Sequence, residues 1–424
     1  MKIAMFTNTY LPHIGGVARS VKTLETAYRK LGHEVRVIAP EFKGAEETPN
    51  VLRVPAIQNF NGSDFSVQLP VPNIIRDFMA DFQPDLIHSH HPFLLGNAAL
   101  REAWKMHVPI IFTHHTLYER YTHYVPLDSP VLKRVVIQLA TGYCNLCDQI
   151  IAPSESVEQL LTERGVNKPI RSIPTGIDTE AFAAGNGDRF RKKMGIPPHA
   201  NVIGHVGRLA KEKNLLYLAE AVDQCLKDDP NALFLIVGDG DARDEIVELL
   251  NPRQVCAAGT LTGGQLADAY AAMDWFVFAS QSETQGLVLT EAMAAGNPVI
   301  ALDGPGVRDI VRDGKNGHLL RHDAPAHEFA EVLSRLMRDP AESRRLADNA
   351  RDTAADFSTE SCARRMLDCY DEVLARHTPV MESDPTPWDR LIADIRIEWE
   401  LLVEQMSAAT NGIILTQTTE ADLD

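Results

Sequence analysis

Residues 275–302, WFVFASQSETQGLVLTEAMAAGNPVIAL, decide the fold of this chain. The apolar run at 275–279 predicts a buried strand, and the small residues at 292–295 followed by Gly296 predict a helix and its end. A second apolar run at 298–302 predicts the next strand. Buried strands joined through a helix are typical of a parallel α/β sheet.

Two glutamates, Glu283 and Glu291, stand eight positions apart in this stretch, on either side of Gly286 and Leu287. We expect Glu283 in a loop at the carboxyl end of the strand, and Glu291 in the second turn of a helix that Gly286 and Leu287 begin. Free N–H groups and the positive dipole end at a helix start suit an anionic ligand. A carboxylate further along repels phosphate but accepts two hydrogen bonds from a vicinal diol. Together these features describe a nucleotide sugar, although two solvated glutamates explain the spacing equally well.

The composition indicates an ordinary globular enzyme. The chain has 424 residues, of which 45% are apolar and 23% charged, and this length predicts two or three domains. Its apolar runs fall short of the roughly 18–20 residues that span a bilayer. The N-terminal run is too short for a signal peptide and predicts a first buried strand instead. Six scattered cysteines, of which only Cys144 and Cys147 have ligand-like spacing, indicate a reducing cytosol rather than a zinc site.

Charge is distributed unevenly along the chain. Residues 1–175 contain 17 Lys and Arg against 16 Asp and Glu, whereas residues 176–424 contain 24 against 42. An acidic second half argues against nucleic acid as a partner. It does not argue against a small anionic ligand in a local pocket.

Short apolar runs alternate with helical patterns twice along the chain. The first series has strands at 3–7, 34–39, 51–54, 86–88, 110–113, 149–152 and 170–173, with helices at 16–31, 94–107 and 154–163. The second has strands at 201–206, 233–238, 255–257, 275–279, 299–302 and 317–320, with helices near 214–227, 242–250, 263–271 and 285–295. We therefore predict two Rossmann-like, doubly wound α/β domains, 1–176 and 177–376, with an open crevice between them. In such sheets ligands bind beyond the carboxyl ends of the strands.

Residues 377–424 form a linker and an acidic extension. Apolar residues recur at helical spacing between 388 and 406, and the extension contains two Arg against ten Asp and Glu. Such a helix would be repelled by anionic lipid, so we expect it to pack on the enzyme body or on a second subunit.

Two loops carry groups that suit a diphosphate. Gly15 and Gly16 follow the first strand and begin a helix, so the backbone can approach phosphate closely. The pattern is not GxGxxG, which disfavours a nicotinamide dinucleotide, and a simple tight turn is the alternative. After the first strand of the second series, Arg208 offers a planar fork and Lys213 a point charge. Together they can neutralise a leaving diphosphate, although a solvated charge run is the alternative.

The possible metal ligands are better explained without a metal. Histidines cluster at 88–91 and at 114–115, but neither pair is framed by a carboxylate at a familiar ligand spacing. We expect them to hydrogen-bond a sugar. Asp239-Gly240-Asp241 directly follows a predicted strand, and we interpret it as a turn with an aspartate N-cap.

Together, these residues resemble the retaining glycosyltransferases of family 4, which have the GT-B fold. The resemblance covers residues 1–377 and rests on the Gly15-Gly16 loop, residues 174–178, Arg208 with Lys213, and the glutamate pair. It implies an acceptor-side first domain, a donor-binding second domain, a nucleotide-diphosphate sugar as substrate, and no cofactor or metal. It also implies roles for nine residues: diphosphate contact by Gly15 and Gly16, diphosphate neutralisation by Arg208 and Lys213, donor-sugar contact by Glu283, Gly286, Leu287 and His115, and ribose binding by Glu291.

A narrower resemblance concerns residues 113–124, THHTLYERYTHY, which are similar to the acceptor-side segment of diacylglycerol glucosyltransferases. It implies a UDP-linked donor, glucose as the favoured sugar, a lipid acceptor, and a role in glycolipid biosynthesis for the cell envelope. The enzyme would be cytoplasmic and peripheral at the inner face of the membrane, with residues 130–140 as a possible contact. The alternatives are a mannosyl- or glucosyltransferase acting on a soluble glycan or small polyol, a nucleotide-sugar 2-epimerase, and a catalytically silent sugar-nucleotide binder.

Overall fold

The computed structural model describes residues 1–13, 15–42, 44–45, 47–57, 67–68, 72–120 and 129–377. The predicted extension at 388–406 and part of the acceptor-like segment at 113–124 lie outside these ranges. The described residues divide into two compact units, 1–173 with 363–377, and Pro174–Cys362.

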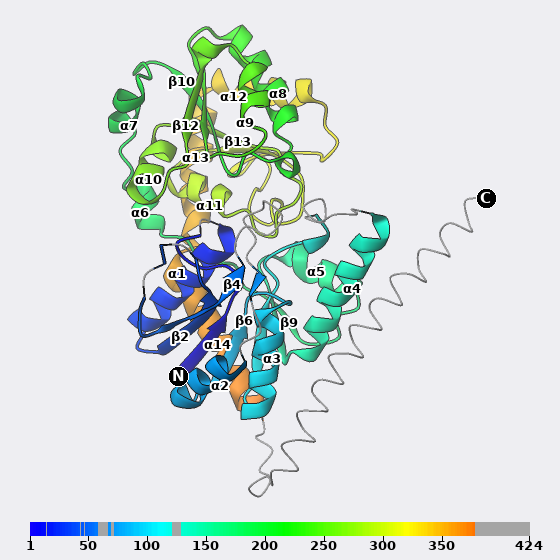
Figure 1. The fold of residues 1–424 in the computed structure, drawn as a ribbon. Coiled ribbons are helices and arrows are strands. Elements are labelled where there is room, and N and C mark those ends of the chain that lie inside the picture. Colours follow the sequence, from blue (N-terminus) through cyan, green and yellow to red (C-terminus); the bar gives the residue numbers. More distant parts are fainter. Residues whose placement is uncertain are drawn as a thin grey trace, which may run out of the picture. The chain divides into compact units, whose positions relative to one another are not determined.

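The first unit is built on a seven-stranded parallel sheet with the order β3-β2-β1-β6-β7-β8-β9 (Figure 1). Its strands are β1 Lys2–Phe6, β2 Glu34–Pro40, β3 Val51–Val54, β6 Leu86–Ser89, β7 Ile110–Thr113, β8 Gln149–Ala152 and β9 Ile170–Ser172. Two short strands, β4 Ala56–Ile57 and β5 Val67–Gln68, pair beside it. Its helices are α1 Gly16–Lys30, α2 Pro72–Phe82, α3 Leu95–Met106, the 3-10 turn η2 Tyr118–Arg120, α4 Pro130–Leu146 and α5 Glu155–Glu163.

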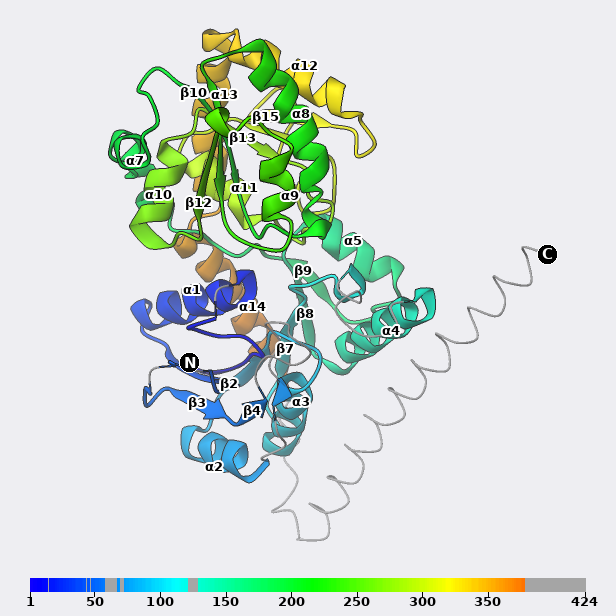
Figure 2. The ribbon, with the colours of Figure 1, turned by 45° about the horizontal axis from the view of Figure 1, so that its top comes forward.

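Helices cover both faces of this first sheet, and each face has its own apolar core. Helices α2, α3, α4 and α5 pack on one face, around side chains such as Phe6 and Phe112. Helix α1 packs on the other face together with the last described helix, α14 Thr359–Arg376, as the turned view of Figure 2 shows. The sheet is therefore doubly wound, as its alternating sequence pattern predicts.

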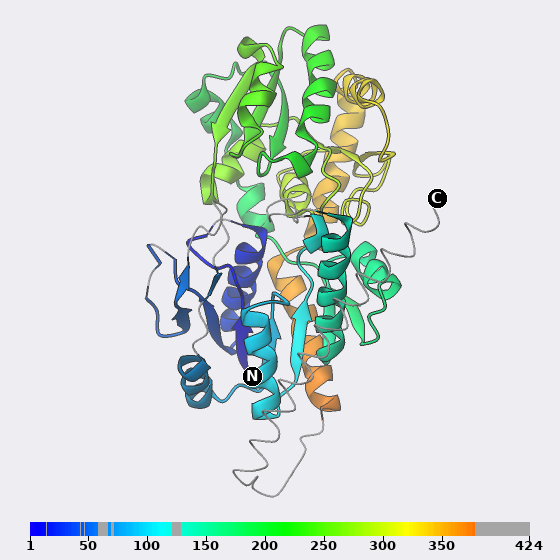
Figure 3. The same cartoon turned by 45° about the vertical axis from the view of Figure 1, so that its right-hand side comes forward.

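The second unit contains a six-stranded parallel sheet with the order β12-β11-β10-β13-β14-β15, seen from another side in Figure 3. Its strands are β10 Asn201–Val206, β11 Ala232–Val237, β12 Val255–Gly259, β13 Trp275–Phe278, β14 Val299–Leu302 and β15 Gly317–Leu320. Its helices are α6 Thr179–Ala183, α7 Gly187–Met194, α8 Leu215–Asp228, α9 Arg243–Glu248, α10 Gly263–Ala271, α11 Leu287–Ala294, α12 Ala326–Met337 and α13 Pro340–Ala355, with 3-10 turns η4 Lys211–Lys213 and η5 Pro252–Gln254. Helices α8, α9 and α12 cover one face, and α6, α7, α10, α11 and α13 the other.

The predicted fold class, two Rossmann-like doubly wound units, is confirmed. The predicted aspartate N-cap in Asp239-Gly240-Asp241 is wrong, because α9 begins one residue later, with Ala242 at its N-cap. Asp239 instead accepts a hydrogen bond from the N–H of Gly240 at 2.9 Å, which closes the turn locally. Helices α6 and α7 lie between the predicted strands at 170–173 and 201–206, where we predicted no helix.

Helix α14 begins in the second unit and ends in the first. The predicted second domain extends to residue 376, whereas the side chains of Met366, Cys369 and Tyr370 are buried in the core of the first sheet. Near its start, the backbone of Ile177 accepts a hydrogen bond from Thr359 at 2.9 Å and donates one to Phe357 at 2.8 Å. The segment that begins the second unit and the segment near its end are therefore hydrogen-bonded to each other.

Candidate functional site

The second unit brings Lys213 and Glu283 together, although they are 70 residues apart in the sequence. Strands β10 and β13 are parallel neighbours, so the loops after them start from the same edge of the sheet. The ammonium of Lys213 lies 2.5 Å from Oε1 of Glu283, and only 14% and 17% of their side chains are exposed. The hydroxyl of Ser280 donates to the same carboxylate oxygen at 2.8 Å.

This pair keeps Glu283 ionised. Burial alone would raise the pKa of Glu283, but the Lys213 ammonium and the hydrogen bonds from Lys213 and Ser280 outweigh it and lower the pKa. The carboxylate therefore remains an acceptor, as contact with sugar hydroxyls would require.

Arg208 lies on the same loop as Lys213. Its guanidinium forms an ion pair with Glu212, whose side chain is 7% exposed, while the Arg208 side chain is 45% exposed. Glu212 is a residue that sequence reasoning missed, although its spacing of four from an arginine is a common ion-pair spacing. The mostly buried carboxylate of Glu212 binds one terminal nitrogen, Nη2, of the Arg208 guanidinium and so restrains its orientation.

The loop between Glu283 and helix α11 is fixed by its amide and glycine residues. Gln285 accepts from the N–H of Thr175 at 2.7 Å and donates to its carbonyl at 2.8 Å, so the loop is tied to the start of this unit. Gly286, at the N-cap of α11, has φ +78°, in the left-handed region that favours glycine. The helix start thus lies directly after the loop of Glu283, as predicted.

Glu291 is fully buried within α11. Its exposed fraction is 0%, and its Oε2 accepts a hydrogen bond from the hydroxyl of Tyr270 at 2.8 Å. Its predicted contact with a ribose stays a prediction.

His205 was not predicted and lies beside the Lys213–Glu283 pair, where both charges act on its pKa. Its Nδ1 lies 3.1 Å from the carbonyl of Val277, which can only accept, so Nδ1 bears the proton and Nε2 is a bare acceptor. Burial lowers its pKa to about 4. A lone histidine inside the apolar run at 201–206 is the sequence signal that could have identified it.

In the first unit, the predicted residues lie at the carboxyl edge of three adjacent strands. Gly15 is the N-cap of α1 and Gly16 its first residue, in the connection that follows β1. His115 follows β7 and is half-buried, with its Nε2 2.9 Å from Nδ1 of His90, which follows β6. The roles proposed for these residues stay predictions.

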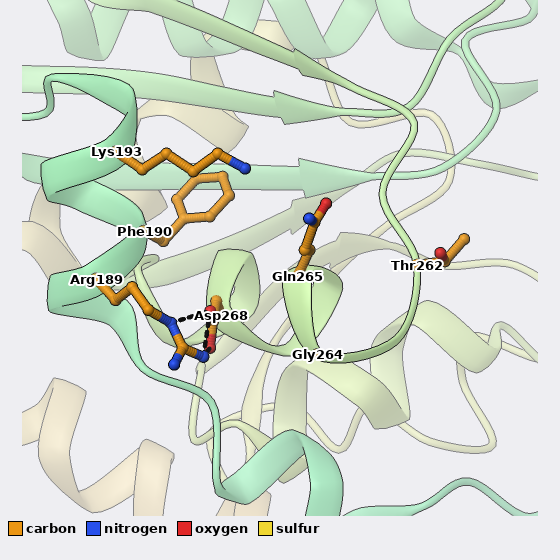
Figure 4. A pocket seen from close by; sticks show the side chains of 7 residues that line it. All are labelled: Arg189, Phe190, Lys193, Thr262, Gly264, Gln265 and Asp268. Carbon is orange, nitrogen blue, oxygen red and sulfur yellow. Dashed lines mark hydrogen bonds and ion pairs between the residues drawn. The ribbon is translucent and has the colours of Figure 1, made fainter.

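A hollow of about 590 Å³ opens elsewhere on the second unit, between α7 and α10 (Figure 4). Its lining includes none of the predicted site residues. Arg189 contacts Asp268 there with two hydrogen bonds of 2.7 Å, which join the two helices. We interpret this ion pair as structural.

Gly238 packs closely against the backbone of the loop that carries Arg208, and replacing Gly238 tests whether that packing positions the loop. It has φ +135°, and a Cβ there would lie 1.9 Å from the carbonyl oxygen of Gly207. We expect Gly238→Ala to destabilise the protein by about 3 kcal/mol, because both the backbone and the loop must shift. Urea unfolding would measure the effect.

Gly264→Ala is the matched control, because a Cβ at Gly264 meets no atom within 4 Å. We expect that variant to be at least as stable as the wild type, since alanine favours helix. Equal stability of both variants would contradict the supporting role of Gly238.

Comparison with known proteins assigns the chain to a family. The protein-family model described as Glycosyltransferase Family 4 matches residues 14–181. The family model described as Glycosyl transferases group 1 matches residues 186–353. An alpha-monoglucosyldiacylglycerol synthase of Streptococcus pneumoniae is 31% identical over 352 residues, which are 80% of this chain and 79% of that protein. The chain belongs to glycosyltransferase family 4.

This family 4 glycosyltransferase is also similar to a GDP-mannose-dependent alpha-mannosyltransferase of Mycobacterium tuberculosis, at 28% identity over 385 residues, 89% of this chain and 98% of that protein. Its structure matches sucrose-phosphate synthase of Thermosynechococcus elongatus with a TM-score of 0.72 and 22% identity, over 88% of this chain and 99% of the other. The predicted GT-B fold is confirmed.

Two observations bear on metals and membranes. Within the described ranges, groups of three or more His, Cys, Asp or Glu side chains arranged to hold a metal ion are absent. Among the same residues, no helix is long and apolar enough to cross a membrane. The six cysteines, all within the described ranges, are free thiols.

Proposed function

We propose that this glycosyltransferase moves a hexose, with glucose favoured, from a UDP-linked donor to a hydroxyl of a lipid such as diacylglycerol. The observation that carries the donor half of the proposal is the Lys213–Glu283 pair, in the loop that also bears Arg208 and in the loop ahead of the start of α11. An ammonium that suits a diphosphate thus lies next to an ionised carboxylate that suits sugar hydroxyls.

The proposed reaction proceeds with retention and without a metal. The bond between the anomeric carbon and the diphosphate oxygen breaks as the acceptor oxygen bonds to the same face of that carbon. The acceptor proton passes to the departing diphosphate. Arg208 and Lys213 stabilise the negative charge that develops there, which is the task that a metal ion performs in other transferases.

The lipid acceptor is supported by the similarity to the pneumococcal synthase, whose name specifies diacylglycerol. Helix α4 supports a contact with a membrane surface, as predicted for residues 130–140. Its apolar side chains at Val131, Leu132, Val135, Val136 and Leu139 are all only half-buried. The reaction would then take place at the inner face of the cytoplasmic membrane.

A donor screen tests this proposal. Purified protein is incubated with UDP-glucose, UDP-galactose or GDP-mannose, with and without diacylglycerol in mixed micelles, and release of the nucleoside diphosphate is measured. We expect release with UDP-glucose that depends on diacylglycerol and survives a metal chelator. The lipid product is identified by mass spectrometry, and NMR of its anomeric proton reports the configuration.

Each competing function gives a different result in the same screen. Release with GDP-mannose and a small polyol would favour a soluble acceptor, consistent with the similarity to a mannosyltransferase. Conversion of the donor without an acceptor would favour an epimerase. An absence of turnover with every donor and acceptor would overturn the proposal.

A further inference from the structure

Five buried or half-buried histidines lie within or directly after strands β6 and β7 in the first unit: His88, His90, His91, His114 and His115. Burial is the largest cause of the lowered pKa of each. The pKa of His88 and of His91 falls to about 3 and that of His114 to about 4. These rings are therefore neutral near pH 7, so each carries one proton on one of its two nitrogens.

The rings of His90 and His115 form one hydrogen bond with each other. His90 Nδ1 and His115 Nε2 are 2.9 Å apart, so one nitrogen donates its proton and the other accepts it. The other nitrogen of His90, Nε2, is buried and lacks a partner among the described residues. A buried N–H without an acceptor is rarer than a buried acceptor without a donor, so Nε2 is the bare nitrogen and Nδ1 donates. His115 then bears its own proton on Nδ1.

The ring of His90 packs against the ring of His88, which is itself fixed by hydrogen bonds. The centroids of these two rings are 4.1 Å apart. His88 is held at both nitrogens, by Thr113 Oγ1 at 2.7 Å and by the hydroxyl of Tyr370 at 2.5 Å. Tyr28 donates to Tyr370 at 3.2 Å, so α1 and α14 both support the stack. His90 can therefore hardly turn away from His115.

We propose that His90 is a positioning residue that holds the ring of His115 in place with its proton on Nδ1. This inference rests on the proposed function, and on the contact with the donor sugar that the family resemblance implies for His115. A neutral ring can offer an N–H to a sugar oxygen. A protonated ring would oppose the positive charge that develops at the anomeric carbon as the diphosphate leaves.

Three neighbouring histidines that are themselves neutral lower the pKa of His115: His90, His91 and His114. His115 in turn lowers the pKa of His88. His91 accepts from the backbone N–H of Asn8 at 3.1 Å, which fixes its proton on Nε2. None of these three neighbours favours the charged form of His115.

Two substitutions of His90 that are nearly isosteric with each other test the proposal. In His90→Asn, the amide nitrogen replaces Nδ1 as a donor, and we expect kcat within about threefold of the wild type. In His90→Asp, a carboxylate that only accepts replaces the donor, so His115 must move its proton to Nε2 and its pKa rises. We expect kcat of His90→Asp to fall on the order of tenfold or more, with KM for the donor changed less.

The pH profile separates positioning from a purely structural role. Wild type and His90→Asn should keep a constant kcat as pH falls from about 8 to about 6, whereas His90→Asp should lose activity progressively over that range as His115 becomes charged. His199→Asp, at an exposed histidine, is the matched control and should behave as the wild type. Equal kcat values and equal pH profiles for His90→Asn and His90→Asp would overturn the proposal.

A measurement on the unmodified protein covers the case in which His90→Asp fails to fold. Nitrogen-15 chemical shifts of histidine rings distinguish protonated from bare nitrogens. We expect His115 to show a protonated Nδ1 and a bare Nε2 at neutral pH, and a protonated Nε2 would overturn the proposal. Because this result needs no turnover, it remains readable even if the donor screen overturns the proposed function itself.

Discussion

Replacing Lys213 by methionine is expected to lower kcat for glycosyl transfer by about 10²- to 10³-fold. The ammonium is the charge that would neutralise the departing diphosphate, and methionine has similar length without charge. In the proposed function, free UDP and the UDP-linked donor share the diphosphate. Binding of free UDP should therefore weaken as well. Steady-state kinetics and calorimetric titration with UDP would measure these effects.

The same substitution should also destabilise the protein. It leaves Glu283 mostly buried beside Ser280 without its cation, and breaking such a pair typically costs about 3–5 kcal/mol. The double variant Lys213→Met with Glu283→Gln should recover much of this stability but none of the activity. Lys211→Met, at an exposed lysine of the same turn, is the control. A wild-type kcat in Lys213→Met would contradict the role assigned to Lys213.

Glu283→Gln is expected to lower kcat on the order of 10- to 100-fold while leaving the affinity for free UDP nearly unchanged. In the proposed function this carboxylate contacts the hydroxyls of the transferred sugar, which UDP lacks. The comparison with Lys213→Met therefore separates a sugar contact from a phosphate contact. Glu248→Gln, at an exposed glutamate of α9, is the control. Loss of UDP affinity in Glu283→Gln to the same extent as in Lys213→Met would argue against separate roles.

Glu283 should also affect the pH dependence of stability. Because its pKa in the folded protein lies below the usual 4.5, its ionised form stabilises the fold above that value. This contribution is lost as pH falls from about 4.5 through the lower, folded pKa. Thermal unfolding followed over acidic pH should therefore show a steeper loss of stability in the wild type than in Glu283→Gln.

Much of the fold was predictable, because most sheet strands are apolar runs bounded by turn residues. The strands at 110–113, 201–206 and 299–302 have the predicted limits. Helices α6 and α7 were missed, because they are short and only Phe182 and Phe190 are buried in them. The longer α12 and α13 were not among the predicted helices either. The path of α14 was not predictable either, since an apolar stripe does not specify which sheet it packs against.

The site was predictable where chemistry depends on spacing along the chain, and not where it depends on contacts between distant segments. The loop of Glu283 and the helix start at Leu287 follow from local pattern. The ion pair of Lys213 with Glu283 depends on β10 and β13 being neighbours. The hydrogen bond between His90 and His115 likewise depends on the pairing of β6 with β7. A single sequence contains no direct signal for either pairing.

The course of α14 determines how this enzyme could be recombined with its relatives. A chimaera that takes its donor-binding unit from another family member needs two junctions, one near Ile173 and one near Cys362, rather than a single crossover. A fragment that stopped at residue 176 would lack Met366, Cys369 and Tyr370. The sheet face that α1 and α14 cover together would then be partly exposed. The pairing of Ile177 with Phe357 and Thr359 brings both junctions close to one short stretch of backbone, which would have to be exchanged as a unit.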